Sequence, residues 1–295
     1  MRPDVAPFHH AATGTWTYVV ADPATRAAAI VDPVLDYDWK SGRTGTVAAD
    51  GIGQHCREHG LDVRWILETH AHADHLSAAQ HLKAGLGGRI AIGAGICDVQ
   101  RTFKRLFGLG PDFEPDGRQF DRLLVDGEEL PLGTLSVRVV ATPGHTSDSV
   151  SYLVGDAVFI GDTLFMPDSG SARCDFPGGD AAQLYRSIRQ RIFSLPPGTR
   201  VFVCHDYCPG RRAAECETTV TEQRRANVHL RDDVGEADFV RMRTERDATL
   251  EVPNLIVPSV QVNIRAGRLP PPDPDGVSYL RVPLNVFGRA KCVAE

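Results

Sequence analysis

The stretch Glu68–His75, which reads ETHAHADH, decides how this chain is interpreted. It contains the pattern His-x-His-x-Asp-His and begins at the end of Arg64–Glu68 (RWILE), a segment typical of a buried strand. Two imidazoles that are two residues apart converge only on an extended or looping backbone, so His70 and His72 fit the end of a strand better than the middle of a helix. Imidazoles and carboxylates are common metal ligands. The stretch therefore predicts a metal site at the end of this strand.

Three further metal-type side chains follow predicted strands elsewhere in the chain. His145 comes after LSVRVVA, Asp162 after AVFI, and His205 after RVFV. Loops at one edge of a rigid scaffold can bring polar groups together without burying unpaired backbone. A lone histidine after a strand is more often a hydrogen-bonded residue than a ligand, so the interpretation of His145 and His205 depends on the ETHAHADH motif. We expect the four segments to form one cluster.

The composition is that of a globular protein. The chain has 295 residues, of which 42% are hydrophobic, and a net charge of −6. This length is ample to bury a core, whereas the negative charge and the scattered basic residues disfavour a partner such as nucleic acid or an anionic membrane. The apolar runs are too short to span a bilayer, and the first ten residues do not resemble a secretory or transit signal. We therefore expect a cytoplasmic protein with seven reduced cysteines that binds neither nucleic acid nor membrane.

Strands and helices alternate along the chain, with closely spaced strands in its middle. The expected strands are at 15–20, 27–31, 64–68, 89–92, four segments between 123 and 164, and 200–204; the expected helices are at 47–59, 74–85, 97–107 and from 180 onward. The polar segment 36–45 is predicted to be a loop. This order indicates an α/β fold in which helices cover two sheets. We expect a catalytic domain over 1–225 and an extension over 226–295 that packs on it.

Together with the separated His145, Asp162 and His205, the motif resembles the hallmark of the metallo-β-lactamase superfamily. The resemblance covers roughly residues 12–210. It implies an αββα sandwich with the metal at the rim between the two sheets. Because this superfamily includes thioester hydrolases, lactonases, nucleases, oxygen reductases and sulfur dioxygenases, the fold alone does not determine the reaction.

Several other segments resemble the bacterial branch of the persulfide dioxygenases, the family of the ethylmalonic-encephalopathy protein. They are DPVLDYDWKSGRTGT (32–46), TLFMPDSGSARCDFPGG (163–179) and PSVQVNIRAG (258–267). The resemblance implies one non-haem Fe(II) per chain, held by His70, His145 and Asp162, a set that leaves open positions on the metal. The other members of the cluster would act in catalysis by orienting ligands or by hydrogen bonding to bound water or O2; they are His72, Asp74, His75 and His205.

The same resemblance implies glutathione persulfide as the substrate, which O2 and water convert to sulfite and glutathione. The two carboxylates of glutathione call for a basic, planar donor near the iron, and Arg173 matches an arginine of the family. Tyr207, Asn263 and Arg265 are further candidates for substrate binding. Arg173 could instead form a structural ion pair with Asp175. We expect Cys174 to be an unreactive thiol, and a homodimer is compatible with the sequence.

Two other interpretations remain open. A dinuclear zinc hydrolase of glutathione thioesters (glyoxalase II type), or a related lactonase, would place one metal on His70, His72 and His145. It would place the other on Asp74, His75 and His205, with Asp162 as a bridge that helps to activate a hydroxide. The helical C-terminal substrate domain of such hydrolases is not recognisable here. The second alternative is a non-catalytic, metal- or sulfide-responsive binding protein, although the sequence contains no recognisable DNA-binding module.

Overall fold

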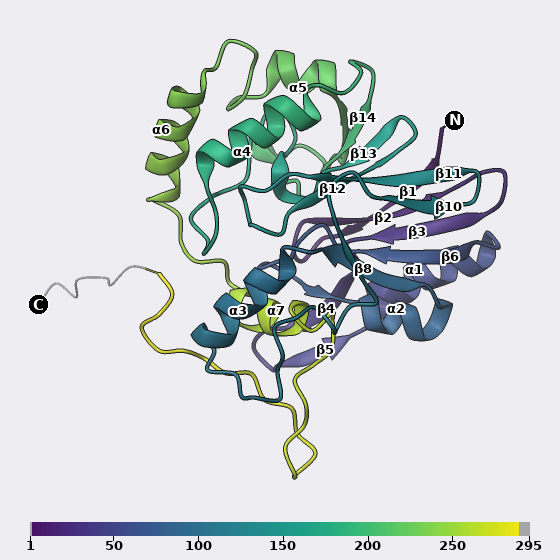
Figure 1. Cartoon of the computed structure of the whole chain (residues 1–295), viewed down its shortest axis with the longest axis vertical. Coiled ribbons are helices and arrows are strands. Elements are labelled where there is room, and N and C mark those ends of the chain that lie inside the picture. The colour runs from purple at the N-terminus through teal and green to yellow at the C-terminus, as the bar shows by residue number, and fades with distance from the viewer. Residues whose placement is uncertain (1, 289–295) are drawn as a thin grey trace, which may run out of the picture.

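The computed structural model describes residues 2–288, which form four layers in the order helices, sheet, sheet, helices (Figure 1). The strands of the first sheet are, in spatial order, β1 (Asp4–His10), β2 (Thr15–Ala21), β3 (Ala27–Val31), β6 (Asp62–Leu67), β8 (Arg89–Gly93) and β9 (Arg122–Leu124). The second contains β10 (Glu129–Leu132), β11 (Leu135–Ala141), β12 (Val150–Val154), β13 (Ala157–Phe159), β14 (Arg200–Phe202) and β15 (Glu217–Thr219). The predicted αββα sandwich is confirmed.

The first sheet is apolar on both faces, which explains the unbroken apolar runs in its sequence. Val19 of β2 and Ile30 of β3 face the helices, whereas Val20 and Ala29 face the second sheet. Successive side chains of a strand point to opposite faces, so a sheet that is covered on both sides needs apolar residues at every position. A third apolar cluster lies between the second sheet and its own helices. One apolar core thus holds the two sheets together, and a further core lies between each sheet and its helices.

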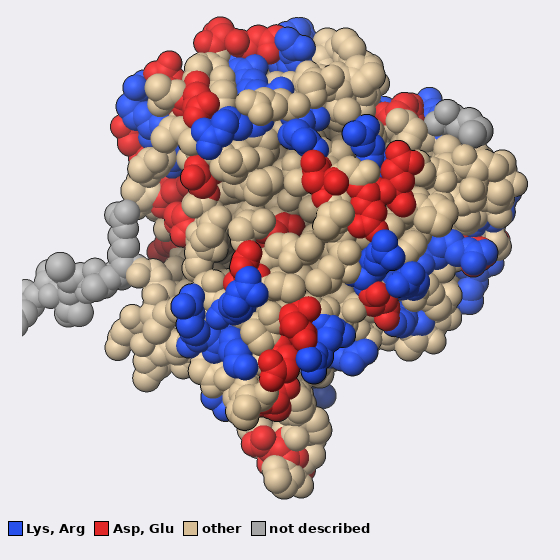
Figure 2. All heavy atoms as spheres, viewed as in Figure 1, with Lys and Arg blue, Asp and Glu red and all other residues tan. Residues whose placement is uncertain are grey.

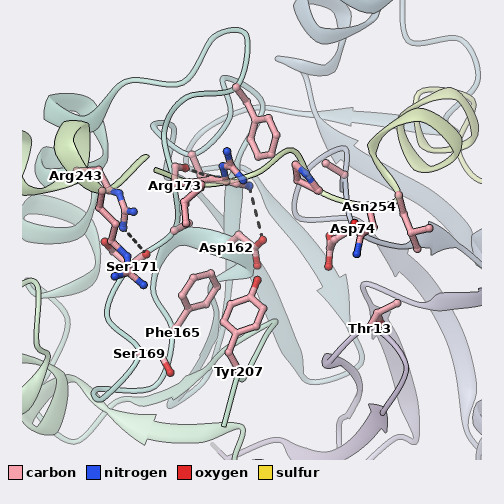
Figure 3. A pocket seen from close by; sticks show the side chains of 18 of the residues that line it. Thr13, Asp74, Asp162, Phe165, Ser169, Ser171, Arg173, Tyr207, Arg243 and Asn254 are labelled. Carbon is pink, nitrogen blue, oxygen red and sulfur yellow. Dashed lines mark hydrogen bonds and ion pairs between the residues drawn. The ribbon is translucent and has the colours of Figure 1, made fainter. Parts of the chain in front are cut away.

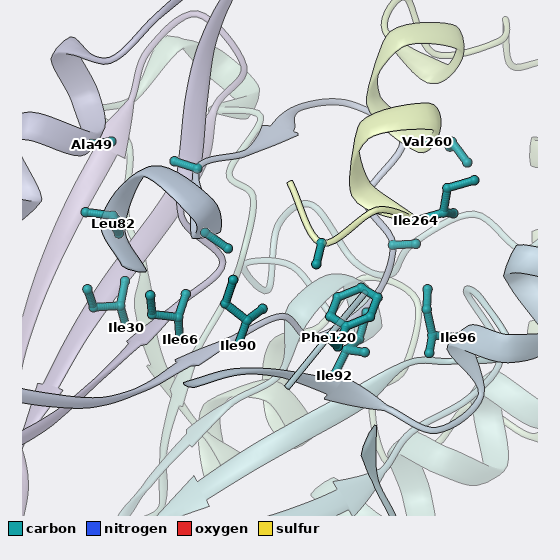
Figure 4. Close-up of a cluster of buried hydrophobic side chains, with 14 of the residues drawn as sticks. Ile30, Ala49, Ile66, Leu82, Ile90, Ile92, Ile96, Phe120, Val260 and Ile264 are labelled. Carbon is teal, nitrogen blue, oxygen red and sulfur yellow. The ribbon is translucent and has the colours of Figure 1, made fainter. Parts of the chain in front are cut away.

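Helices of both halves of the chain cover the sheets. Those whose apolar side chains join the core of the first sheet are α1 (Val47–Glu58), α2 (Ala79–Leu86), α3 (Ile96–Leu106) and α7 (Ile256–Asn263). Those on the second sheet are α4 (Ala181–Ser187), α5 (Val220–Ala226) and α6 (Glu236–Asp247), with short helical turns at Gly161–Thr163, Ile188–Ile192 and Pro209–Arg211. Val260 and Ile264, four residues apart, enter the same core as Ile66 and Ile90 (Figure 4). The segment after residue 225 therefore contributes to the cores of both sheets.

Two local predictions are wrong, and strands β1, β10 and β15 were not predicted. The expected loop at 36–45 contains the hairpin of β4 (Val34–Asp38) and β5 (Arg43–Gly45). This hairpin pairs with the short strand β7 (Leu76–Ser77) in a small third sheet. As a result, the helix that was expected to begin at Asp74 begins only at Ala79. Asp74 resembles a helix N-cap in sequence, but its carboxylate lies in the polar cluster described below.

On the face shown in Figure 2, acidic and basic side chains are interspersed, and no broad basic patch is visible. None of the helices between residues 2 and 288 has the length and apolar character needed to cross a lipid bilayer.

Candidate metal centre

The loops that follow four strands meet at one edge of the two sheets. His70, His72, Asp74 and His75 come after β6, His145 after β11, Asp162 after β13, and His205 after β14. All five histidines are at most 5% exposed. The structure therefore brings together the whole set of metal-type residues that the sequence singled out, and it divides them into groups.

His70, His145 and Asp162 form what we call the first group. Nε2 of His145 lies 3.7 Å from Oδ2 of Asp162, and Nε2 of His70 lies 4.0 Å from the same oxygen. These separations are too long for hydrogen bonds. They are the separations expected of ligands around one cation, because ligand atoms about 2.1 Å from a metal lie roughly 3–4 Å from one another.

Both imidazoles of the first group are oriented from behind by hydrogen bonds. Nδ1 of His145 donates to the carbonyl of Arg173 at 2.7 Å. Nδ1 of His70 lies 3.0 Å from Oγ1 of Thr69, whose hydroxyl donates to Oδ2 of Asp32 at 2.9 Å. Because the threonine proton is engaged with Asp32, His70 must be the donor. Each ring is thus fixed in the tautomer that directs the Nε2 lone pair toward the centre of the group.

Burial, together with the neighbouring His72 and His145, lowers the pKa of His70 well below its usual value. This imidazole is therefore neutral at physiological pH. A histidine must be neutral to bind a metal, so His70 requires no deprotonation before it can act as a ligand.

Asp74, His205 and the other oxygen of Asp162 form the second group. Nε2 of His205 lies 2.9 Å from Oδ2 of Asp74 and 3.5 Å from Oδ1 of Asp162. Although burial lowers the pKa of His205, the carboxylates of Asp162 and Asp74 raise it to about 9. In the absence of a metal, His205 is therefore protonated at neutral pH and forms an ion pair with Asp74. Asp162 has one carboxylate oxygen in each group.

His72 and His75 lie outside both groups. Nε2 of His72 is 3.0 Å from Oδ1 of Asp32 and 3.8 Å from Oε2 of Glu68. Burial lowers the pKa of His72, but the adjacent Asp32 raises it to about 10. Burial and then His72 lower the pKa of His75 to about 3. His72 therefore forms an ion pair with Asp32 beneath the first group, whereas His75 is a neutral imidazole.

Asp32 and Glu68 belong to the polar support of the site, and sequence reasoning did not single them out. Asp32 also accepts a bond from the backbone N–H of Thr69 at 2.7 Å, so it fixes the start of the motif loop. Burial and the charge of Asp32 raise the pKa of Glu68 to about 8. The only signal in the sequence was position: Asp32 directly follows a predicted strand, as the metal-type residues do.

A cation fits this cluster, because many of its buried ligand atoms have no hydrogen bond. Among residues 2–288 these atoms include Nε2 of His70, Nδ1 of His72, Oδ2 of Asp74, Nε2 of His75, Oδ1 of Asp162 and Nε2 of His205. A buried polar atom without a partner costs about 1–3 kcal/mol, so such a concentration is expected where another group binds these atoms. Imidazoles and carboxylates suit iron and zinc alike.

A cavity of about 480 Å³ opens beside the first group (Figure 3). Asp74, His145 and Asp162 form one end of it, and Tyr207 lies on its wall. The phenol ring of Tyr207 is parallel to the imidazole of His205, with ring centres 5.9 Å apart, and it contacts Phe165 edge-on at 5.2 Å. Tyr207 is therefore placed where a bound molecule could contact it, and its role in substrate binding stays a prediction.

Arg173 also lines the cavity, but its guanidinium is engaged with other residues. It donates to both carboxylate oxygens of Asp175, at 2.6 and 2.7 Å, and to the carbonyl of Glu251 at 2.7 Å. This is the structural ion pair that the sequence left open as the alternative to a substrate contact. The neighbouring Cys174 is buried, which raises the pKa of its thiol well above the usual value, as expected of an unreactive cysteine.

Asn263 and Arg265, predicted to contact the substrate, lie on or just after α7 and do not line the cavity. Nδ2 of Asn263 donates to the carbonyls of His72 and His75, both at 2.8 Å, and its Oδ1 accepts the N–H of Ser77. The guanidinium of Arg265 stacks on Phe113 at 4.6 Å. Because α7 packs against β7, Asn263 fixes the motif loop from behind and is shielded from the cavity.

Comparisons with known proteins show relatives of about 50% identity and relatives of 30% identity, which carry different names. The family model described as "Metallo-beta-lactamase superfamily" matches residues 11–205. A Burkholderia pseudomallei protein named probable metallo-hydrolase is 54% identical, over 95% of this chain and 98% of the relative. Glyoxylase B2 of Dictyostelium discoideum is 49% identical over 96% of both chains.

Human mitochondrial persulfide dioxygenase ETHE1 is 30% identical, over 86% of this chain and 84% of that protein. The crystal structure of ETHE1 from Myxococcus xanthus matches with a TM-score of 0.71 at 30% identity, over 90% of this chain and all of that one. The names of these relatives thus include a metallo-hydrolase, a glyoxylase and a persulfide dioxygenase.

Proposed function

The chain belongs to the metallo-beta-lactamase superfamily, and we propose that it is an iron-dependent persulfide dioxygenase with glutathione persulfide as its substrate. In the overall reaction, glutathione persulfide, O2 and water give glutathione and sulfite. The S–S bond breaks, and the terminal sulfur acquires two oxygen atoms from O2 and one from water. His70, His145 and Asp162 would hold one Fe(II) ion per chain. Bound there, Fe(II) would supply redox chemistry toward O2 that Zn(II) lacks.

The observation that carries the proposal is the geometry of the first group. Two imidazoles and one carboxylate converge, none within hydrogen-bonding distance of another, and each imidazole is oriented by a group that is not a ligand. A set of two histidines and one carboxylate is typical of non-haem iron oxygenases, because it leaves adjacent positions open for a substrate and O2. The likeness to persulfide dioxygenase ETHE1 in sequence and structure supports the same interpretation.

The residues around the cavity provide binding and shielding. A volume of about 480 Å³ lies within the range of small-molecule sites. Apolar side chains form much of the lining; they include Ala73, Phe165, Phe176, Leu250, Pro253 and Leu255. They limit the access of bulk water to a sulfur atom near the first group. Asp74 lines the same space in contact with His205, so this pair can hold a proton beside the reacting molecule.

A dinuclear hydrolase of glutathione thioesters is the second candidate. It is favoured by the unbonded Nδ1 of His72 and Nε2 of His75, which could complete two metal sites, and by the relative named glyoxylase B2. In this alternative, Asp162 would bridge the two metals, and both groups would hold one.

Oxygen uptake by protein of known iron content tests the proposal. With glutathione persulfide, we expect one O2 consumed for each sulfite formed, and glutathione alone should cause no uptake because it lacks the terminal sulfur. Rapid cleavage of S-lactoylglutathione without O2, together with no uptake on persulfide by the iron-loaded protein, would contradict the dioxygenase and support the hydrolase.

A further inference from the structure

Three arginines line the cavity beside the first group, and their surroundings differ. They are Arg173, Arg243 and Arg246. The carboxylates that line the cavity, Asp74 and Asp162, both belong to the metal-type cluster. Which arginine is available to an anionic substrate therefore depends on what each guanidinium already binds.

Arg173 has little capacity left for a second carboxylate. Its Nε and one terminal nitrogen bind the two oxygens of Asp175 in a bidentate pair, and the other terminal nitrogen donates to the carbonyl of Glu251. The guanidinium also lies 5.2 Å from the ring centre of Phe176. A substrate carboxylate could bind Arg173 in the same bidentate manner only by displacing Asp175.

Arg243 is buried and compensated as well. It is 1% exposed, and its Nε and a terminal nitrogen lie 2.8 and 2.6 Å from Oδ1 of Asp247. Its remaining terminal nitrogen donates to the carbonyl of Ser171, while Oδ2 of Asp247 accepts the N–H of Cys174. This pair therefore ties α6 to the segment 171–174, whose Arg173 carbonyl orients His145. Its role is structural.

Arg246 differs from both. It is exposed and lies three residues after Arg243 on α6, where it also lines the cavity. Within residues 2–288, its guanidinium forms no hydrogen bond or ion pair. Arg246 also borders a second surface hollow with Asp238 and Glu245, neither of which is ion-paired with it, and Asp238 is paired with Arg241 at 2.5 Å. Because the other two arginines are neutralised by Asp247 and Asp175, Arg246 supplies the uncompensated positive charge of this cavity.

We propose that Arg246 is the residue that binds a carboxylate of the substrate, whereas Arg173 and Arg243 shape the cavity. The persulfide sulfur would lie at the first group, and a carboxylate of the peptide would lie at α6. The inference rests on the proposed function for the identity of the substrate. A glutathione thioester has the same two carboxylates and could bind the same arginine. The role of Arg246 can therefore be tested separately from the reaction.

Anaerobic calorimetry of the iron-loaded protein with reduced glutathione separates binding from turnover. We expect Arg246→Met to weaken glutathione binding about tenfold. This is near the lower end of the affinity losses that follow removal of a charge-assisted hydrogen bond, because solvent screens an exposed site. N-acetylcysteamine, a thiol without a carboxylate, should bind equally to the wild type and the variant. Arg241→Met is the matched control, because Arg241 lies on the same helix but does not line this cavity; its glutathione affinity should be unchanged.

Turnover adds a second measurement. Arg246→Met should raise KM for glutathione persulfide with little change in kcat, and Arg246→Lys should restore part of the loss. Unchanged glutathione affinity in Arg246→Met, an equal loss for both thiols, or no glutathione binding by the wild type would overturn the proposal. A lack of oxygen uptake by the wild type would overturn the proposed dioxygenase but would leave the glutathione comparison intact.

Discussion

The two groups of metal-type residues share Asp162 but differ in how their charges are compensated. In the first group, His70 and His145 lie 4.0 and 3.7 Å from Asp162, and the second nitrogen of each ring is held by another residue. In the second group, His205 and Asp74 lie 2.9 Å apart and neutralise each other. A cluster of ligand-type residues is thus not uniform: one part is prepared for a cation, and the other is an ion pair that can exist without one.

The difference has a simple physical origin. Buried polar atoms must be paired, and a charge in the interior needs an opposite charge. His205 and Asp74 compensate each other's charge at 2.9 Å, although their facing atoms form no hydrogen bond, whereas the Nε2 atom of His70 has the Asp162 carboxylate only at 4.0 Å. We therefore expect the first group to bind iron more strongly than the second. The predictions below test that difference and the residues that support the site.

The largest effect is expected from removal of the shared carboxylate. Asp162→Ala should abolish iron binding and lower persulfide turnover at least 1,000-fold (order of magnitude), because the only carboxylate of the first group is lost. His145→Ala should have the same effect on iron. Elemental analysis and oxygen uptake measure both quantities. Iron retention by either variant would show that the first group is not the iron site.

A smaller effect is expected when the second group is altered. His205→Ala should keep most of the iron and slow turnover roughly 10- to 100-fold, as for residues that act on a metal from outside its ligand set. The same two measurements apply. If His205→Ala loses iron as completely as His145→Ala, the difference between the groups does not exist and the dinuclear interpretation gains support.

The support behind His70 can be tested with an isosteric change. Thr69→Val removes the hydroxyl that lies between His70 and Asp32, so the imidazole loses its orienting bond. We expect iron affinity to fall about tenfold, at the lower end for such partners, in a chelator competition assay. Thr221→Val, at the exposed start of α5, is the control. An unchanged affinity would mean that packing alone orients His70.

The smallest functional effect is expected at Asn263. Asn263→Ala removes three hydrogen bonds to the motif loop and should lower the free energy of unfolding by about 1–3 kcal/mol. Glutathione affinity should remain near that of the wild type, because Asn263 does not line the cavity. Denaturant unfolding and calorimetry measure the two quantities. A large loss of affinity with unchanged stability would restore the original prediction of a substrate contact.

The sequence predicts the layers and the metal-type residues well because both depend on local patterns. Apolar runs identified the strands, and ETHAHADH identified the end of β6. The contacts that orient these residues could not be predicted, because they join distant parts of the chain. Asn263 contacts carbonyls 188 and 191 positions away, through the packing of α7. The prediction that a helix begins at Asp74 was wrong for a related reason. The pairing of β7 with β4, which are distant in sequence, overrides the local capping signal of Asp74.

The measurement that tests the central difference most directly is the metal content of the purified protein. Elemental analysis of protein from unsupplemented cells should find about one iron per chain and little zinc, because the first group is prepared for a cation and the second is an ion pair. Two tightly held zinc ions per chain, with little iron, would contradict this account, because both groups would then be metal sites and the dinuclear hydrolase would be the better interpretation.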